Sequence, residues 1–401
     1  MRVLILATDI YTRGGIARYT RTLAEALGWL LGAENVDVLP LLGDTGPTFA
    51  STRYHTLEPT TNTLNLPAKV RHIARSLLCS RKRYDLVVCS HLGLTPLAAL
   101  IKACHKTPYF VACYGAEAWS AFPLPVRLGV KRADLLLPIS RHTRGMLHRV
   151  NGVSQEKMYL LYPAVPDDLA SLLTVAKRTR VSGPCAGGRE RILLSAGNLG
   201  KPHRYKGFDT VIHALPGILE AVPEVQYVIV GDGDDRPYLE RLSAEMGVAE
   251  HVKFAGSLTD EELAAHYRAC DLFVLPSRAR QHIGHWDGEG FGIVYIEAAL
   301  AGKAVVGSLG GGAAEAVLHR KTGLLVDPVS VKEIGDAIIT LLANPDLASR
   351  MGREGRWWAS QRFTTTGLRS SLKDLLRHYG YTLNPEVQEQ PTCGLETVIE
   401  L

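Results

Sequence analysis

The chain has 401 residues, of which 46% are hydrophobic and 21% are charged, and its formal net charge is +5. This length exceeds what one hydrophobic core usually supports, so we expect two domains with a cleft between them. The composition is that of a globular protein, and the lack of an apolar run of about 20 residues excludes a membrane-spanning helix.

The first apolar run, residues 3–7, is too short for a signal peptide and is predicted to be a buried strand. The cysteines lie at positions 79, 89, 104, 113, 185, 270 and 393. Their odd number and their lack of paired metal-ligand spacing predict free thiols and argue against a disulfide or zinc framework. We therefore expect a cytoplasmic protein.

Short apolar runs alternate with helical periodicity along the chain. In the first half they lie at residues 3–7, 85–89, 109–113 and 135–139. After a glycine-rich linker at residues 182–188 they recur at 192–196, 227–230, 252–255, 272–275, 304–307 and 324–326. Such runs, bounded by turn residues, are typical of buried parallel strands. The predicted fold class is α/β, with two Rossmann-like, doubly wound parallel-sheet domains.

The predicted domain limits are residues 1–183 for the first domain and 189–362 for the second. From Lys332 onward the pattern is helical, and a last helix is expected at residues 363–380. Residues 381–401 include Pro385, Pro391 and Gly394, and we predict that they form a flexible tail.

The charge is unevenly divided. Before Cys185 there are about 11 more basic than acidic residues, and after it about 6 more acidic than basic residues. The basic residues of interest are Arg71, Arg75, Arg81, Lys82, Arg83, Arg127, Lys131 and Arg132. They could recognise a phosphorylated or lipid-linked acceptor, or hold the protein peripherally at an anionic membrane face. Nucleic acid is disfavoured, because no basic run is interleaved with stacking aromatic residues.

The alternative is that these charges lie on the solvated faces of ordinary core-packed helices. One such helix carries an apolar stripe that is suited to the core. The stripe consists of Val70, Ile73, Ala74, Leu77 and Leu78.

Two glycine turns join strands to helices. Gly14 and Gly15 follow the first strand and could admit a diphosphate to a helix N-terminus, or they form a structural turn. The turn lacks the Gly-x-Gly-x-x-Gly spacing, which argues against a nicotinamide enzyme. In the second domain, residues 195–207 carry Arg204 and Lys206, which could neutralise a diphosphate leaving group or form a solvated basic loop.

The most informative segment is residues 287–297, a glycine-spaced acidic turn that runs into an apolar helix. The backbone of Gly290, Phe291, Gly292 and Ile293 could form an anion site where the helix begins. Glu297 lies one turn further on among apolar residues, where a carboxylate needs a partner such as the diol of a ribose. The alternative is that Glu289 and Glu297 only favour the helix N-terminus electrostatically.

Over residues 1–380 the chain resembles the retaining glycosyltransferases of family 4, which have the GT-B fold of two Rossmann-like domains facing a central cleft. The most specific mark is the Glu-x7-Glu motif in EGFGIVYIEA, at Glu289 and Glu297. It is supported by the Gly14-Gly15 turn and by YKG, VGDGDDR, PSR and LGGGAAEAV, which begin at residues 205, 230, 276 and 309.

The resemblance implies an N-terminal acceptor domain, a C-terminal donor domain, and a last helix that crosses back to the first. It assigns the donor diphosphate to Lys206, the ribose to Glu297 and the transferred sugar to Glu289 beside the backbone of residues 290–293. It places the nucleotide base near Gly256, Ser257 and Leu258. No cofactor and no divalent metal are expected.

Two departures from the family pattern concern the site. An arginine that is usual in the family aligns with Asn198, so Arg204 is expected to substitute for it. A histidine near the reacting centre is Tyr114 here, followed by Gly115 and Glu117 on the acceptor side. His91, at the end of another strand, could reach the same region or be an ordinary structural histidine.

The predicted activity is retaining transfer of a sugar from a UDP- or GDP-sugar to a hydroxyl acceptor, giving an α-glycoside in glycan, glycolipid or small-glycoside synthesis. The departing phosphate, held by Lys206 and Arg204, would deprotonate the incoming hydroxyl on the same face. Two alternatives remain open: an epimerase or hydrolase of the nucleotide sugar, and a catalytically degenerate nucleotide-sugar-binding subunit.

Overall fold

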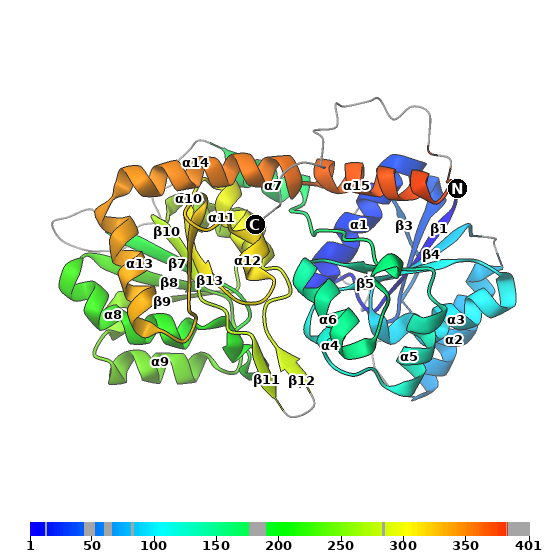
Figure 1. The fold of residues 1–401 in the computed structure, drawn as a ribbon, viewed down its shortest axis with the longest axis horizontal. Coiled ribbons are helices and arrows are strands. Elements are labelled where there is room, and N and C mark those ends of the chain that lie inside the picture. The colour runs from blue at the N-terminus through cyan, green and yellow to red at the C-terminus, as the bar shows by residue number, and fades with distance from the viewer. Residues whose placement is uncertain are drawn as a thin grey trace. The chain divides into compact units, whose positions relative to one another are not determined.

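A computed structural model describes residues 1–12, 14–43, 53–59, 66–81, 84–175, 190–282, 285–381 and 383. They form two compact units (Figure 1). Unit 1 comprises the described residues of Met1–Ala164 and Gln361–Leu401, and unit 2 those of Val165–Ser360. The linker expected at residues 182–188, most of the expected tail, and Lys82, Arg83, Cys185 and Cys393 lie outside the described residues.

Unit 1 contains a six-stranded parallel sheet in the order β3-β2-β1-β4-β5-β6. Its strands are β1 (Val3–Ala7), β2 (Val36–Pro40), β3 (His55–Thr56), β4 (Leu86–Cys89), β5 (Tyr109–Cys113) and β6 (Leu135–Pro138). All residues of β1, β2, β4, β5 and β6 are buried, as expected for a sheet covered on both faces.

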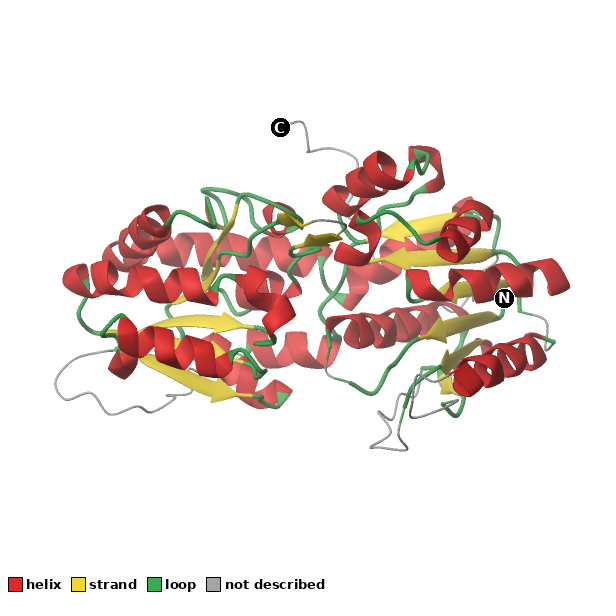
Figure 2. Ribbon diagram, turned by 90° about the horizontal axis from the view of Figure 1, so that it is seen from below, coloured by secondary structure: helices red, strands yellow, loops and turns green. Residues whose placement is uncertain are grey.

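The helices of unit 1 lie between these strands or follow the last of them. They are α1 (Gly15–Leu31), η1 (Ala33–Asn35), α2 (Leu66–Ser80), η2 (Leu92–Leu94), α3 (Thr95–His105), α4 (Ala116–Trp119), α5 (Leu124–Arg132), α6 (Arg141–Asn151), η3 (Gln155–Lys157) and α15 (Thr365–His378). Figure 2 shows strands between helices in each unit. The expectation of doubly wound parallel sheets is confirmed.

Unit 2 repeats the design with a six-stranded sheet in the order β14-β13-β10-β7-β8-β9 and a two-stranded hairpin, β11-β12. Its strands are β7 (Arg191–Ala196), β8 (Val225–Val230), β9 (Val252–Gly256), β10 (Leu272–Leu275), β11 (Arg280–His282), β12 (His285–Asp287), β13 (Ala304–Ser308) and β14 (Gly323–Val326). Its helices are α7 (Asp167–Thr174), η4 (Lys201–Lys206), α8 (Phe208–Ala221), α9 (Arg236–Glu245), η5 (Ala249–His251), α10 (Asp260–Ala269), α11 (Ile293–Leu300), α12 (Ala313–Ala316), α13 (Val331–Ala343) and α14 (Pro345–Arg362).

Unit 2 begins at Val165, earlier in the chain than the expected domain limit at residue 183. Helix α7 lies before that limit, yet it packs on α10 and α11 of unit 2. The guanidinium of Arg268 in α10 donates to the carbonyl of Leu172 in α7. These contacts assign residues 165–175 to unit 2.

The last described helix, α15, belongs to unit 1 and packs on α1. The Arg369 guanidinium lies 4.9 Å from the centre of the Trp29 ring. Tyr159 Oη donates to the carbonyl of Ser371 at 3.2 Å. Unit 1 is therefore built from both ends of the chain.

The apolar pattern missed two strands of unit 1, β2 and β3. Asp37 interrupts the apolar run of β2, and β3 has only two residues. Asp37 is nevertheless buried, because Tyr84 Oη donates to its carboxylate at 2.6 Å and Arg2 Nη2 at 3.4 Å. A buried carboxylate with such partners is tolerated within a strand. The hairpin β11-β12 was missed because its polar residues give no apolar run.

The expected core stripe on helix α2 is wrong for the side chains that the structure describes, which do not include that of Val70. Ile73 and Leu78 are 40% and 58% exposed, whereas the polar side chains of His72, Ser76 and Ser80 are buried. Ser76 and Ser80 satisfy their hydroxyls within the helix, by donating to the carbonyls of His72 at 2.7 Å and Leu77 at 2.9 Å. Because these bonds replace those to water, the polar stripe can face the protein and the apolar stripe faces outward.

Over the part of the chain that is described, no helix combines the length and apolar character needed to cross a bilayer. The five described cysteines, Cys79, Cys89, Cys104, Cys113 and Cys270, are free thiols.

We predict that Gly231→Ala destabilises unit 2. Gly231 has φ of 129°, and an added Cβ would lie 1.9 Å from the carbonyl oxygen of Gly197. Overpacking and backbone strain together should cost about 2–4 kcal/mol, measured as a lower melting temperature. The control is Gly217→Ala in α8, where an added Cβ meets no atom within 4 Å. This control should be neutral or stabilising, and equal effects of the two changes would contradict the prediction.

Candidate active site

Several residues that the sequence singled out lie in unit 2, at the point where the order of its strands changes direction. The sheet extends from β7 through β8 to β9 on one side, and from β10 through β13 to β14 on the other. Ligands of such sheets bind beyond the carboxyl ends of the strands at this switch point. Lys206 lies in the connection after β7, and Glu289 lies in the segment after β10.

Lys206 and Glu289 form an ion pair across the switch point. Lys206 Nζ donates to Glu289 Oε2 at 2.8 Å, and the side chains are only 12% and 16% exposed. Burial alone would lower the pKa of Lys206, but the Glu289 carboxylate outweighs it and raises that pKa above the ordinary value. The lysine therefore remains protonated, and the site holds a shielded cation whose present partner is a carboxylate.

The Glu289 segment is held by the glycine loop that follows β13. The Gly312 N–H donates to the carbonyl of Glu289 at 3.0 Å. A Cβ on Gly312 would lie 1.9 Å from the carbonyl oxygen of Gly290, so this close approach requires glycine. The glycine-spaced turn at residues 287–292 and the glycine loop at residues 310–312 are thus in direct contact.

Glu297 lies in α11 and is 2% exposed. Tyr267 Oη, from α10, donates to Glu297 Oε2 at 2.8 Å. The buried carboxylate therefore has a hydrogen-bond donor within the protein, as its apolar surroundings required. Gly292 caps this helix in the left-handed region, and Ile293 is its first residue. Contact with a ribose stays a prediction.

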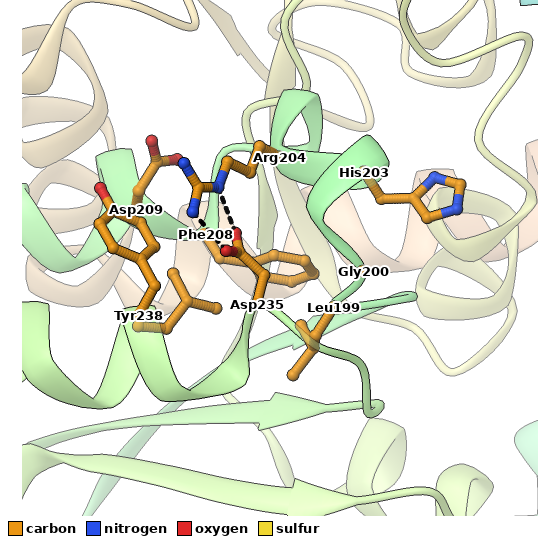
Figure 3. A pocket seen from close by; sticks show the side chains of 9 residues that line it. Leu199, Gly200, His203, Arg204, Phe208, Asp209, Asp235 and Tyr238 are labelled. Atoms are coloured by element: carbon orange, nitrogen blue, oxygen red, sulfur yellow. Dashed lines mark hydrogen bonds and ion pairs between the residues drawn. The ribbon is translucent and has the colours of Figure 1, made fainter.

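Arg204 is bound by a partner that the sequence did not reveal. Its Nε donates to Asp235 Oδ2 at 2.6 Å, its Nη2 to Asp235 Oδ1 at 2.5 Å, and its guanidinium lies 4.4 Å from the centre of the Tyr238 ring (Figure 3). Asp235 is only 4% exposed, whereas Arg204 is 49% exposed. The buried carboxylate requires this counter-charge, so Arg204 is turned toward α9 rather than bonded to the Lys206–Glu289 pair.

These residues line a small pocket between η4 and α9 (Figure 3). Its lining is completed by Leu199, Gly200, His203, Phe208, Asp209 and Leu239. Neither Lys206 nor Glu289 belongs to this lining. The pocket is therefore distinct from the ion pair.

Asn198 and the expected base-binding segment lie at the carboxyl ends of β7 and β9, the two strands that flank β8. Asn198 Oδ1 accepts from the Gly200 N–H at 2.6 Å, which shapes the turn after β7. Gly256 ends β9, with Ser257 exposed and Leu258 half-buried after it. The Gly231 N–H donates to the Gly256 carbonyl at 2.9 Å and joins this segment to the turn after β8.

In unit 1, Gly14 caps α1 and Gly15 is its first residue. His91 Nδ1 accepts from the Gly93 N–H at 3.0 Å and so caps η2. Glu117 accepts from the N–H groups of Tyr114 at 2.6 Å and Gly115 at 3.0 Å. His91 and Glu117 therefore have structural roles in their own turns, and their contact with an acceptor stays a prediction.

Tyr114, at the position of the family histidine, is buried against Tyr19, with the ring centres 5.5 Å apart and edge to face. Burial, reinforced by Tyr19, raises the pKa of the Tyr114 phenol well above its usual value. The group is therefore neutral at ordinary pH, so it is not a proton acceptor of the kind that a histidine provides.

Sequence reasoning did not assign a role to Asp235, Tyr267 or Arg278. Asp235 and Arg278 lie in the segments VGDGDDR and PSR, whose sequences do not indicate the contacts that these residues make. Their partners, Arg204 and Asp209, are 31 and 69 residues away in the chain. Tyr267 lies in a helix with no motif. The sequence indicated that Glu297 needs a partner, but not which residue provides it.

Comparison with known proteins identifies the class. Residues 186–358 match the family model for glycosyl transferases group 1, and residues 14–164 match that for a glycosyl transferase 4-like domain. A GDP-mannose-dependent alpha-(1-6)-phosphatidylinositol monomannoside mannosyltransferase of Mycobacterium tuberculosis is 36% identical over 298 residues, which cover 71% of this chain and 72% of that protein. The chain belongs to glycosyltransferase family 4 and is a glycosyltransferase that uses a nucleotide-sugar donor.

Solved structures agree on the GT-B fold. Sucrose-phosphate synthase of Thermosynechococcus elongatus has a TM-score of 0.78 at 21% identity, covering 95% of this chain and 99% of that one. Anabaena HepE, solved in complex with UDP, has a TM-score of 0.76 at 21% identity, covering 94% and 100%. At this level of identity the likeness establishes the fold alone.

We predict that Lys206→Met and Glu289→Gln each destabilise the ligand-free protein, because each leaves a shielded charge without its partner. A loss of about 2–4 kcal/mol is expected for each, with a smaller loss in the double variant than the sum. Thermal or urea unfolding measures it, and strictly additive losses would contradict the pairing.

The pH dependence follows from the raised pKa of Lys206. A raised folded-state pKa contributes stability that is fully present below the unfolded-state pKa and is lost as pH rises through the folded value. The loss of unfolding free energy caused by Lys206→Met should therefore be constant from about pH 6 to about pH 9.

Proposed function

We propose that the protein is a retaining α-mannosyltransferase that transfers mannose from GDP-mannose to a hydroxyl of a lipid-linked acceptor. The proposal is supported by the Lys206–Glu289 pair at the sheet switch point, in a chain that is 36% identical to a GDP-mannose-dependent mannosyltransferase. Lys206 would bind the diphosphate, Glu289 the mannose hydroxyls, Glu297 the ribose, and residues 256–258 the base.

Donor binding would exchange the partners of a buried cation. In the structure Glu289 balances the charge of Lys206. The diphosphate would take over Lys206, aided by the helix N-terminus at residues 290–293, and Glu289 would then be available to the sugar. This charge compensation supports catalysis without a divalent metal, which is part of the proposal. Full activity in excess EDTA is the corresponding expectation.

The proposed chemical step takes place on one face of the sugar. The bond from the anomeric carbon to the diphosphate oxygen breaks, and its electron pair leaves with GDP. The acceptor oxygen forms the new bond on the same face, and its proton passes to the departing diphosphate. Lys206 stabilises the charge that develops on the leaving group. Arg204, bound to Asp235, is given a secondary role at most.

The donor prediction is tested by thermal unfolding with GDP, UDP, ADP, TDP and NADH. A ligand at 100 times its dissociation constant stabilises by about 2.7 kcal/mol, so GDP should raise the melting temperature by several degrees. Mannose transfer from GDP-mannose, with an α-configured product by NMR, completes the test. A shift with UDP alone would overturn the donor assignment, and a shift with NADH alone would overturn the whole proposal.

The same assays separate the alternatives. Release of free mannose or an isomerised donor without an acceptor would identify a hydrolase or epimerase. Nucleotide binding with no turnover on any acceptor would identify a degenerate binding subunit.

A lipid-linked acceptor requires access to a membrane, and neighbouring helices of unit 1 carry exposed residues suited to one. Helix α3 contacts both α2 and α5. The exposed apolar side chains of these helices are Ile73, Leu78, Leu100, Leu124 and Leu128. Exposed cations among them and beside them are Arg71, Arg81, Arg127, Lys131 and Arg132. We call these residues the α2–α5 face and propose that it docks peripherally on an anionic lipid surface.

Helix α5 shows the chemistry of this face most clearly. Leu124 and Leu128 are 63% and 47% exposed and one turn apart, with Arg127 and Lys131 beside them. Apolar side chains that enter the interface, together with cations that contact lipid phosphates, are typical of peripheral membrane helices. The outward apolar stripe of α2 has the same combination.

We predict that the protein sediments with vesicles containing phosphatidylinositol and not with phosphatidylcholine vesicles. Combined Arg127→Gln and Lys131→Gln should weaken binding roughly ten- to thirtyfold, at about 1 kcal/mol per cation, and Leu124→Ser should weaken it as well. The control is Trp357→Ser, which changes a 65% exposed side chain of unit 2. Equal effects of Trp357→Ser and Leu124→Ser would contradict docking through this face.

A further inference from the structure

Lys206 occupies a position that its own helix does not secure. It is the last residue of η4, a six-residue 3-10 helix that begins after Gly200. Helices of this type are seldom longer than about four residues, because their hydrogen bonds are poorly aligned. Carbonyls at a helix end need partners from outside the helix, and the Gly207 N–H donates to that of Arg204 at a long 3.3 Å. The position of Lys206 must therefore depend on contacts from elsewhere.

Two contacts to the end of η4 come from one residue, Arg278, in the segment that leaves β10. The Arg278 N–H donates to the carbonyl of Tyr205 at 2.6 Å. The Arg278 guanidinium, through Nη2, donates to the carbonyl of Arg204. The two carbonyls that immediately precede Lys206 are thus both bound by Arg278.

The guanidinium is itself fixed by a carboxylate. Arg278 Nη2 donates to Asp209 Oδ1 at 2.6 Å, and Nη1 donates to Asp209 Oδ2 at 3.0 Å. The side chains are 8% and 20% exposed. A two-pronged arginine–carboxylate pair is both strong and directional. Asp209 lies in the first turn of α8, where a negative charge is favoured.

The chain on the other side of Lys206 meets the same segment. Gly207 has φ of 81°, and an added Cβ would lie 2.3 Å from the carbonyl oxygen of Pro276. Tyr295 Oη, from α11, donates to the carbonyl of Leu275 at 2.6 Å. Residues 275–278 therefore connect the turn that carries Lys206 to the helix that follows Glu289.

We infer that Arg278, with Asp209 as its counter-ion, is a positioning residue that holds Lys206 where the donor diphosphate binds. The inference rests on the proposed function, because it assumes that Lys206 binds the diphosphate. It assigns Arg278 no contact with the substrate. Arg278 keeps the Lys206 backbone in a conformation that places Nζ next to Glu289 at the switch point.

The test compares GDP with guanosine, which has no phosphate for Lys206 to bind. Arg278→Gln should weaken GDP binding about tenfold or more by calorimetry, because misplacement of a binding group by about 1 Å is costly, and should leave guanosine affinity unchanged. Arg278→Lys keeps the charge but not the fork, so it should restore only part of the GDP affinity. If Arg278→Gln does not fold, Arg278→Lys and Asp209→Asn supply the same comparison.

A matched control is Arg268→Gln. Arg268 also donates from its guanidinium to a backbone carbonyl in unit 2, that of Leu172, but in the contact between α10 and α7. This change should lower the melting temperature without altering the ratio of GDP to guanosine affinity. A general loss of stability is thereby separated from misplacement of Lys206.

A double-mutant cycle tests whether Arg278 affects GDP binding through Lys206. In a Lys206→Ala background, Arg278→Gln should cause no further loss of GDP affinity, because the group it positions is gone. Additive losses, or an unchanged ratio of GDP to guanosine affinity in Arg278→Gln, would overturn the inference alone. If Lys206→Ala itself leaves GDP affinity unchanged, the proposed role of Lys206 fails first, and the inference falls with it.

Discussion

The donor unit depends on one constraint: a protonated lysine and a carboxylate must be held together with little exposure to water at the switch point of a parallel sheet. The Lys206–Glu289 distance of 2.8 Å satisfies it. Because neither charge is tolerated alone in such a place, the loops after β7, β10 and β13 must all fit around the pair. The backbone contact between Gly312 and Gly290 and the bonds from Arg278 to η4 are the means by which they do so.

Parallel strands, glycine turns and the Glu-x7-Glu spacing were readable from the sequence because each is a local pattern. Lys206, Glu289 and Glu297 were identified in this way, and the structure bonds the first two directly. The partners of Arg204 and Glu297 could not be read, because Asp235 and Tyr267 are 31 and 30 residues distant and meet them only in the folded sheet. Arg278 is a further case, since its role lies in contacts with distant backbone carbonyls.

Helix α2 shows a different limit of prediction from sequence. Its apolar period suggested a core stripe, but period alone does not say which side of a helix faces the protein. Here serine hydroxyls bonded to carbonyls of their own helix let a polar stripe be buried, and the apolar stripe is left outside. The same uncertainty affected β2, where Asp37 interrupts the apolar run yet is buried with partners from outside its own strand.

The construction of unit 1 from both chain ends has a consequence for how the protein is made. Residues 165–360 are continuous, so unit 2 can complete its core as soon as it has left the ribosome. Unit 1 begins first, but its helix α1 must wait for α15, which is synthesised after the whole of unit 2. Domains usually fold in the order of their synthesis, whereas here the later unit can finish first. The surface of α1 that receives α15 is therefore exposed on the nascent chain for as long as unit 2 is being translated.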